Sequence, residues 1–235
     1  MKRILLAAAF AIAATPAFAE VPVNFDWSGI HVGILASGDA LTNQAPDGEG
    51  VYYGDYYGSS TVTKLGGGVG VDVGANAQYG HIVLGADLDA SWLGGRATHG
   101  GGYYDLYSYS EGKWNDYITL RAKAGLAIDR GLIYVTGGLA LVNAEYRVCY
   151  EDGCNPSTAG YDYGSKPSQF GFTGGVGFEY ALTDSLTING EYLYVGTASK
   201  TATAPYYLNA DSYVYKATFN SSANFLRVGL NWYVH

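Results

Sequence analysis

Apolar and polar residues alternate along several stretches of this chain, and this alternation limits the fold more than any other feature. In VGVDVGANAQY at 69–79, every second residue is Val, Ala or Tyr, and Gly, Asp, Asn and Gln fill the positions between. IVLGADLDASW, YITLRAKAGLAI and FGFTGGVGFEY follow the same scheme. A period of two is typical of β-strands with one apolar and one polar face. The sequence therefore predicts an all-β fold.

Eight strands of this kind can be placed along the chain. They are expected at residues 27–38, 66–79, 82–95, 114–128, 132–148, 169–182, 186–198 and 223–234. Most have about the length that a tilted membrane-spanning strand requires. The strand at 132–148 alternates well only in its second half, so we expect a β-bulge at Gly137–Gly138.

The segments between these strands alternate between short and long. Tight turns are expected at Gly80–His81, Asp129–Gly131 and Thr183–Ser185, and long connections at 39–65, 96–113, 149–168 and 199–222. An even strand number with this alternation is typical of outer-membrane barrels, whose short turns face the periplasm. We predict an all-β, eight-stranded antiparallel transmembrane β-barrel with three short periplasmic turns and four long extracellular loops.

The first 19 residues have the composition of a secretory signal peptide. Lys2 and Arg3 precede an apolar run, and the small residues around Ala19 predict cleavage between Ala19 and Glu20. A membrane anchor is the alternative, but the segment is short and contains Pro16. Residues 20–235 are then expected to form a single barrel domain.

The charge composition limits which partners the protein can bind and indicates whether it lies in water or in a membrane. The 21 acidic residues outnumber the 13 basic ones, which argues against binding to nucleic acid. Charged residues make up only 14% of the chain, below the quarter typical of soluble domains. A chain poor in charge and without long apolar runs fits a protein that crosses the bilayer as strands.

The two strand faces differ in chemistry, which indicates that the apolar face meets lipid. The polar face combines many glycines with charges of both signs, as a narrow lumen requires, because an unpaired buried charge is costly. A soluble, lipocalin-like barrel would place its aliphatic residues inside instead. We expect an interfacial aromatic girdle at Trp92, Tyr180, Tyr192, Tyr194 and Trp232, and a lumen charge network made of Asp72, Asp87, Asp89, Arg121, Lys123, Glu145, Arg147, Glu179, Glu191 and Arg227.

Several motifs in order resemble one bacterial family. They are Trp27-Ser28-Gly29, LRAKAGLAIDRGLIYVTGGLA, GEYLYVG at 190–196 and RVGLNWYV near the end. The chain resembles the small outer-membrane β-barrel proteins of alphaproteobacteria, the major surface-antigen group that includes the RopB-like proteins. The resemblance spans residues 20–235, apart from the loops, and implies an outer-membrane barrel that contributes to envelope integrity and surface exposure.

The C-terminus departs from the pattern of that family. Its members usually end in an aromatic residue that the barrel-assembly machinery reads as an insertion signal, whereas here Val234 takes that place and His235 follows. The departure concerns the efficiency of recognition by the machinery more than the fold.

Two cysteines lie at the start of the third long connection. Cys149 and Cys154 are close in sequence in an exported chain, so a disulfide is the simplest expectation. A redox or metal site is the alternative, but no histidine lies nearby and the spacing fits no zinc motif. We expect no metal and no cofactor.

Catalytic and nucleotide-binding functions find little support. A hydrolase would need a hydroxyl nucleophile beside a histidine base, and among His31, His81, His99 and His235 only His31 lies on an expected strand. We expect His31 to be a lumen or rim residue. GGGVGVDVG at 66–74 continues as a strand, whereas a phosphate-binding loop opens a helix.

Tyrosines gather in the long connections. Tyr52, Tyr53, Tyr56, Tyr57, Tyr103, Tyr104, Tyr206 and Tyr207 would form an aromatic cluster at the extracellular mouth. Such rings either seal and anchor the rim or bind a partner, because Tyr-, Gly- and Ser-rich loops are also typical of antibody paratopes. A loop site for adhesion or haem, or for another host or small-molecule ligand, is one functional alternative, and a narrow channel is another.

The function expected from these features is a non-enzymatic structural and surface protein of the outer membrane. Both termini would lie in the periplasm. The expected partners are outer-membrane lipid, lipopolysaccharide and, during insertion, the barrel-assembly machinery. We expect a monomer or a weak oligomer.

Overall fold

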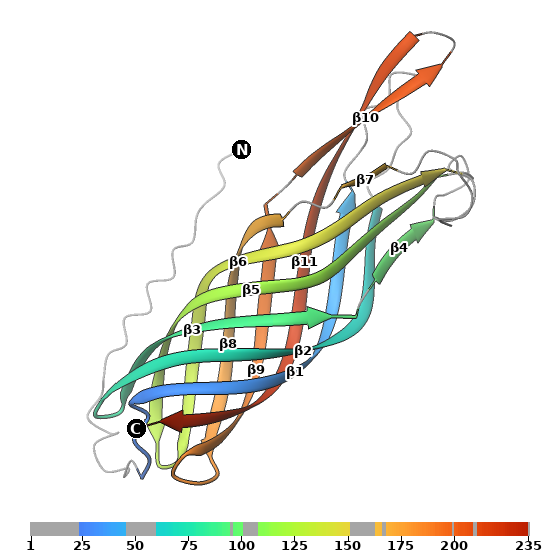
Figure 1. The fold of residues 1–235 in the computed structure, drawn as a ribbon. Helices are drawn as coiled ribbons and strands as arrows, with labels where there is room; N and C mark the ends of the chain where they lie inside the picture. Colours follow the sequence, from blue (N-terminus) through green and yellow to red (C-terminus); the bar gives the residue numbers. More distant parts are fainter. Residues whose placement is uncertain are drawn as a thin grey trace, which may run out of the picture.

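The computed structural model describes residues 24–45, 60–94, 96–100, 108–150, 163–165, 168–198, 200–208 and 211–234. In this part of the chain the strands form a barrel, which Figure 1 shows from the side. No helix among these residues is long and apolar enough to cross a membrane. The strands are β1 (Gly29–Ala45), β2 (Ser60–Tyr79), β3 (Ile82–Leu93), β4 (Arg96–Gly100), β5 (Ser108–Ile128), β6 (Gly131–Tyr150), β7 (Tyr163–Ser165), β8 (Ser168–Ala181), β9 (Leu186–Thr197), β10 (Lys200–Leu208) and β11 (Asp211–Val234).

Eight of these strands form a closed antiparallel ring. Each pairs with the next in the order β1, β2, β3, β5, β6, β8, β9 and β11. Pairing of β1 with β11, from Ile30 opposite Val234 to Gln44 opposite Asn220, closes the ring. Closure leaves no exposed sheet edge along the paired part of the wall. The prediction of an eight-stranded antiparallel barrel is confirmed.

The strands are staggered around the ring. Following paired residues once around the barrel from Ile30, through Ala75 on β2 and Gly137 on β6, leads back to β1 at Ala40. The register is therefore displaced by ten residues of β1, which corresponds to strands tilted by roughly 40° to the barrel axis. This stagger decides which interior side chains share a level.

The three short turns lie where the sequence predicts them. Gly80 and Asp129 have positive φ angles of 62° and 53°, as the tight turns between β2 and β3 and between β5 and β6 require. Residues 182–185 join β8 to β9. Because Gly131 already begins β6, the second turn is one residue shorter than expected.

The predicted long connections contain more paired strand than the sequence indicates. β1 and β2 remain paired up to Ala45 opposite Ser60, and β10 pairs with the start of β11 out to Leu208 opposite Asp211. Short strands β4 and β7 add further pairing to β5 and β6. The β10–β11 hairpin extends beyond the ring of strands (Figure 1). The strands therefore extend into the connections predicted at 39–65, 96–113, 149–168 and 199–222, and the predicted bounds of these connections are too wide.

The physical reason lies in the signal used to place the strands. Apolar alternation marks only strand segments with one face against lipid. Beyond the bilayer the outer face meets water instead of lipid, and main-chain hydrogen bonds hold the strands together without an outward apolar face. In this region Thr42 and Thr63 pair across β1 and β2 through their hydroxyl groups at 3.0 Å.

The expected bulge lies elsewhere. Gly137 and Gly138 pair regularly with Ala122 and Arg121 on β5, and the register shifts instead at Asn115, between Trp114 and Asp116. A side chain at Gly138 would collide with the main chain of Leu120, so this glycine permits close approach of the strands. The extra residue at Asn115 turns Trp114 to the same side as Tyr117, and both are buried inside the barrel.

The outer wall is apolar, and one substitution tests its contact with lipid. Leu120 faces outward near the middle of β5, between Leu88 and Leu139 on the neighbouring strands. We expect Leu120→Arg to destabilise the barrel, lowering its free energy of unfolding in lipid vesicles by about 2–4 kcal/mol. Urea titration measures this loss.

The matched control for this prediction is Ile82→Arg. Ile82 lies beside the short turn that follows β2, and there the expected loss of unfolding free energy is about 0–1 kcal/mol. Equal losses at the two positions would contradict a bilayer centred on the middle of the strands.

Candidate functional site in the barrel lumen

The interior of the barrel has three layers along its axis. The turn-side cluster is apolar and contains Phe25, Trp27, Val83, Ala127, Leu132, Tyr134, Ala181 and Tyr233. The loop-side cluster, also apolar, contains Leu41, Trp114, Tyr117, Ala140, Val142, Ala144, Leu193, Val195, Ala223 and Phe225. Between them lies a polar layer of buried charged and amide side chains.

The segment before β1 crosses the turn-side mouth of the barrel. Asn24 donates its main-chain N–H to the carbonyl of Asp129 at 3.1 Å, in the turn on the opposite side of the ring from β1. The main-chain N–H of Trp27 donates to Gln78 Oε1 at 2.7 Å. The Trp27 side chain is fully buried, with its ring 4.6 Å from Phe25 and 5.9 Å from Tyr233 between centroids. These contacts seat an aromatic plug at this end.

The loop-side cluster closes the other end of the polar layer. Tyr117 and Phe225 contact each other with ring centroids 4.9 Å apart, and both are fully buried together with Trp114. Leu193 and Val195 on β9 complete the packing. Both apolar clusters face the lumen from the strand face that the sequence marks as polar.

Two arginines and two acids form the centre of the polar layer. Arg121 places Nη2 2.9 Å from Asp89 Oδ2 and Nη1 2.9 Å from Glu191 Oε1. Arg227 Nη1 lies 3.3 Å from the other oxygen of Asp89 and 3.5 Å from Glu191 Oε1. Thr119 and Tyr134 donate further hydrogen bonds to Asp89 and Glu191. Two positive and two negative charges therefore neutralise each other.

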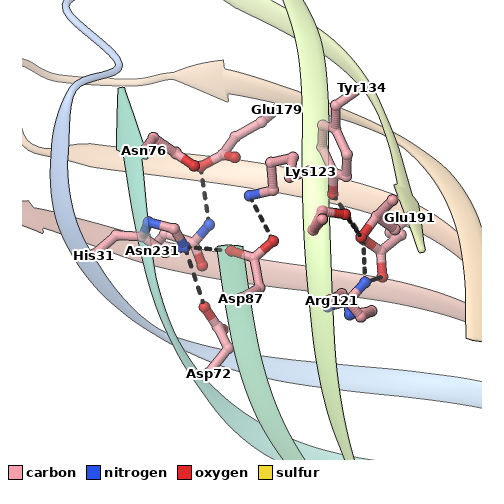
Figure 2. A network of polar contacts seen from close by, with 12 residues as sticks. His31, Asp72, Asn76, Asp87, Arg121, Lys123, Tyr134, Glu179, Glu191 and Asn231 are labelled. Carbon is pink, nitrogen blue, oxygen red and sulfur yellow. Dashed lines mark hydrogen bonds and ion pairs between the residues drawn. The ribbon is translucent and has the colours of Figure 1, made fainter. Parts of the chain in front are cut away.

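A second chain of contacts joins Lys123 to His31 (Figure 2). Lys123 Nζ lies 3.2 Å from Asp87 Oδ2 and 4.9 Å from the centre of the Tyr134 ring. His31 Nε2 lies 3.1 Å from Asp87 Oδ1 and 3.7 Å from Asp72 Oδ2. His31 also stacks on Tyr233, with ring centroids 5.0 Å apart.

Glu179 is buried beside neutral donors. Thr187 Oγ1 donates to Glu179 Oε1 at 2.5 Å, and Asn231 Nδ2 donates to the same oxygen at 2.9 Å. Asn76 lies nearby and donates to the hydroxyl of Tyr233 at 3.0 Å. No basic side chain of the described chain forms an ion pair with Glu179.

Little empty space remains in the polar layer. A cavity of about 20 Å³, lined by residues that include His31, Asp72, Arg121, Glu191 and Asn231, has room for about one water molecule. Among the described residues no group of three or more His, Cys, Asp or Glu side chains is arranged to hold a metal ion.

Comparison with known proteins assigns this barrel to a family. The family model for the outer membrane protein beta-barrel domain matches residues 5–232. The chain belongs to this family.

The chain is also similar to named outer-membrane proteins. The chain is 29% identical to the 31 kDa outer-membrane immunogenic protein of Brucella melitensis, with 99% of each chain covered. It is 27% identical to the 22 kDa outer membrane protein of Rhizobium leguminosarum bv. viciae over 77% of this chain and 70% of that protein. The resemblance to small alphaproteobacterial outer-membrane barrels is confirmed, and the protein is an outer-membrane protein of a Gram-negative bacterium.

Solved structures share the fold. The outer membrane protein OprG from Pseudomonas aeruginosa superposes with a TM-score of 0.55 at 13% identity, covering 91% of this chain and 100% of that chain. The outer membrane protease OmpT from Escherichia coli superposes with a TM-score of 0.53 at 9% identity, covering 91% and 99%. At these identities the likeness concerns the barrel alone.

In this outer-membrane barrel, eight of the ten charges expected in the lumen lie in the polar layer. They are Asp72, Asp87, Asp89, Arg121, Lys123, Glu179, Glu191 and Arg227. Glu145 and Arg147 belong to β6, but their side chains lie outside the described residues. Trp92, Tyr180, Tyr192 and Trp232 point outward, and Tyr194 is half-buried beside Phe172.

Several other expected features fall outside the described residues. These are the cleavage site at Ala19 and Glu20, Cys154, Tyr52, Tyr53, Tyr56, Tyr57, Tyr103, Tyr104 and His235. Cys149 lies on β6 and Tyr206 and Tyr207 lie on β10, with side chains that are likewise not described. The disulfide, the tyrosine cluster and the signal peptide stay predictions.

Sequence reasoning missed the two apolar clusters and the amides of the polar layer. Asn231 and Tyr233 lie an even number of residues from Arg227 on β11 and therefore on the same face. The alternation of the strand could thus have predicted that they point into the barrel. The same alternation could not have predicted that Trp114 points inward, because the bulge at Asn115 shifts the alternation of β5.

Proposed function

We propose that this protein is a non-enzymatic structural component of the outer membrane that supports envelope integrity and is displayed at the cell surface. The observation that carries the proposal is the filled lumen, in which a neutralised ionic centre lies between two apolar clusters. Such an interior stabilises the barrel and leaves no wide path for solutes. The partners that fit this role are outer-membrane lipid and lipopolysaccharide, with the assembly machinery acting during insertion.

The dimensions of the interior weigh against a channel. An eight-stranded barrel is just wide enough for its side chains to fill, whereas general porins use 16–18 strands. Here Trp27 and Phe25 close the turn side, and Trp114, Tyr117 and Phe225 close the loop side. A hydrated path would have to displace both clusters.

The surroundings of His31 weigh against a hydrolase. Its Nε2 atom faces the carboxylates of Asp87 and Asp72 rather than a hydroxyl group, and the side chain is almost fully buried. His81 Nδ1 contacts the carbonyl of Ala127 in a turn. Neither His31 nor His81 contacts, among the described residues, the nucleophile that acyl transfer requires.

The strand extensions support display outside the cell. The paired β10–β11 hairpin extends beyond the ring on the side opposite the short turns (Figure 1), and Tyr206 and Tyr207 belong to β10. One relative is named as an immunogenic protein. A loop site for adhesion or haem is therefore the second candidate, and a haem difference spectrum that disappears on Tyr206→Phe and Tyr207→Phe would support it.

The decisive test combines conductance with a deletion strain. We expect purified protein in planar bilayers to produce no discrete conductance steps, and the deletion strain to show raised permeability and vesiculation that the intact gene restores. Steps that vanish when Arg121 and Lys123 are neutralised would establish the channel instead. Unchanged permeability and vesiculation in the deletion strain would contradict the structural role.

A further inference from the structure

The β10–β11 hairpin forms a ribbon of two strands beyond the closed ring (Figure 1). Residues 200–208 of β10 pair with residues 211–219 of β11. On the other side of β11, the pairing with β1 ends at Gln44 opposite Asn220. Within the described chain, no strand therefore pairs with residues 211–219 on the side away from β10.

The main-chain groups of β11 alternate between its two sides. Tyr233 donates its N–H to the carbonyl of Ser185 at 2.8 Å, in the turn before β9, so the odd-numbered residues of β11 face β9 and β10. The register of β11 is regular against β1 from residue 234 to residue 220 and against β10 from residue 219 to residue 211. The N–H and C=O groups of the even-numbered residues of 211–219 therefore lie along the free edge. These residues are Ser212, Val214, Lys216 and Thr218.

Pro205 supports this assignment and marks the opposite edge of the ribbon. It lies opposite Val214. Proline has no N–H, and within a sheet it occurs on edge strands with its nitrogen facing solvent. The pair is therefore of the kind without hydrogen bonds, and the main-chain groups of Val214 point away from β10. A proline also hinders pairing of a further strand along β10, whereas residues 211–219 contain none.

The free edge of β11 fits one kind of partner. A row of N–H and C=O groups at the spacing of a strand is matched, residue by residue, by another extended polypeptide. A ribbon of two strands is marginally stable in water, so a third strand would also stabilise it. The edge without proline is thus suited to the addition of a strand.

A second copy of this chain is a poor source of that strand. Barrels inserted into one membrane have the same orientation, so the free β11 edges of two copies run in the same direction. Such edges could meet only as a parallel pair, which is less stable per residue than an antiparallel pair. A segment of a different protein has no such restriction and can run antiparallel to β11.

We propose that residues 211–219 of β11 bind an extended segment of another protein, which adds to the ribbon as an antiparallel third strand. The four even-numbered residues supply the main-chain hydrogen bonds. This inference rests on the proposed display at the cell surface, because the ribbon must be accessible from outside. It does not depend on the structural role of the filled lumen.

The experiment uses the full chain folded in detergent micelles and a synthetic peptide as the probe. The peptide has the sequence of residues 200–208 with Pro205→Thr, so that it can pair along its whole length. Hydrogen exchange of the β11 amides is followed by NMR. At a peptide concentration ten times the dissociation constant, exchange at the even-numbered residues should slow about tenfold. The odd-numbered amides already bond to β10 and should not change.

Two proline variants at one position of the ribbon separate its two edges. Thr218→Pro removes an N–H from the free edge of β11 and should weaken peptide binding about tenfold, measured by fluorescence anisotropy of labelled peptide. Thr201→Pro is the matched control, because Thr201 lies directly opposite Thr218 and its N–H faces the other edge. The control should bind the peptide as the wild type does. Neither change removes a hydrogen bond between β10 and β11.

The proposal is overturned if the even-numbered amides are protected before peptide is added, because another part of the chain then covers the edge. Equal loss of binding in the two proline variants would also overturn it. Self-association of the wild type that Thr218→Pro abolishes would assign the edge to a second copy instead. The exchange pattern of the wild type decides the matter even if Thr218→Pro does not fold, and a negative result leaves the conductance and deletion tests of the proposed function unaffected.

Discussion

Replacing Arg121 with Met is expected to lower the free energy of unfolding by about 3–5 kcal/mol, because it breaks a buried ionic group by removing one member. Among the described residues, Arg227 would then be the remaining basic partner of Asp89 and Glu191, at 3.3 and 3.5 Å. The side chains are nearly fully buried, so water cannot solvate the excess negative charge. Urea unfolding in lipid vesicles measures the loss.

The matched control is Arg130→Met. Arg130 lies in the short turn after β5, donates Nε to the carbonyl of Ala181 at 2.9 Å and reaches Asp184 at 3.6 Å, and an ion pair this near to solvent contributes at most about 1 kcal/mol. The double variant Arg121→Met, Glu191→Leu restores the charge balance and should be more stable than Arg121→Met alone. Equal stability of the Arg121 and Arg130 variants would contradict a structural role for the ionic centre.

Trp27→Ala is expected to cost about 3–5 kcal/mol of folding free energy, because it empties the centre of the turn-side cluster. Trp27 is fully buried and packs against Phe25 and Tyr233. Its loss would also loosen the segment before β1, which Asn24 fastens to Asp129 across the mouth. The change should appear as a lower urea midpoint and as faster proteolysis of that segment.

Two control variants distinguish the role of Trp27 in the turn-side cluster from a general effect of removing an aromatic ring. Trp27→Phe keeps a ring in the cluster and should lose less, because the indole Nε1 of Trp27 has no hydrogen-bond partner that phenylalanine would forfeit. Trp232→Ala removes an outward-facing tryptophan from β11 and should also be milder. If Trp27→Ala proved no more harmful than Trp232→Ala, the turn-side cluster would not be stabilising the barrel.

The sequence predicts most of the membrane-spanning wall. Alternation in β3 places Leu88 outward and Asp87 and Asp89 inward, and the structure agrees. The signal weakens at the ends of the strands, where residues 39–45 mix polar and apolar side chains without strict alternation and still continue β1 in pairing with β2. It also fails at Asn115, since a bulge is decided by the fit between β5 and β6 rather than by either strand alone.

The candidate site was only partly accessible from sequence. Strand parity selects the charges that face inward, but it does not say which acid meets which base. Arg121 on β5 reaches Glu191 on β9, although these strands are not neighbours in the ring. That contact spans the lumen and forms only because the two residues lie at the same height along the barrel axis.

What the sequence alone determined is therefore the local property of each strand, namely its existence, its lipid-facing side and the short turn that follows it. Those properties repeat every two residues and need no knowledge of distant parts of the chain. Only the tertiary structure decided the partners within the lumen, because ring closure with a ten-residue stagger brings Asp72, Asn231 and Glu179 to one level from three strands. The register between strands sets those levels, and it is a property of the closed barrel as a whole.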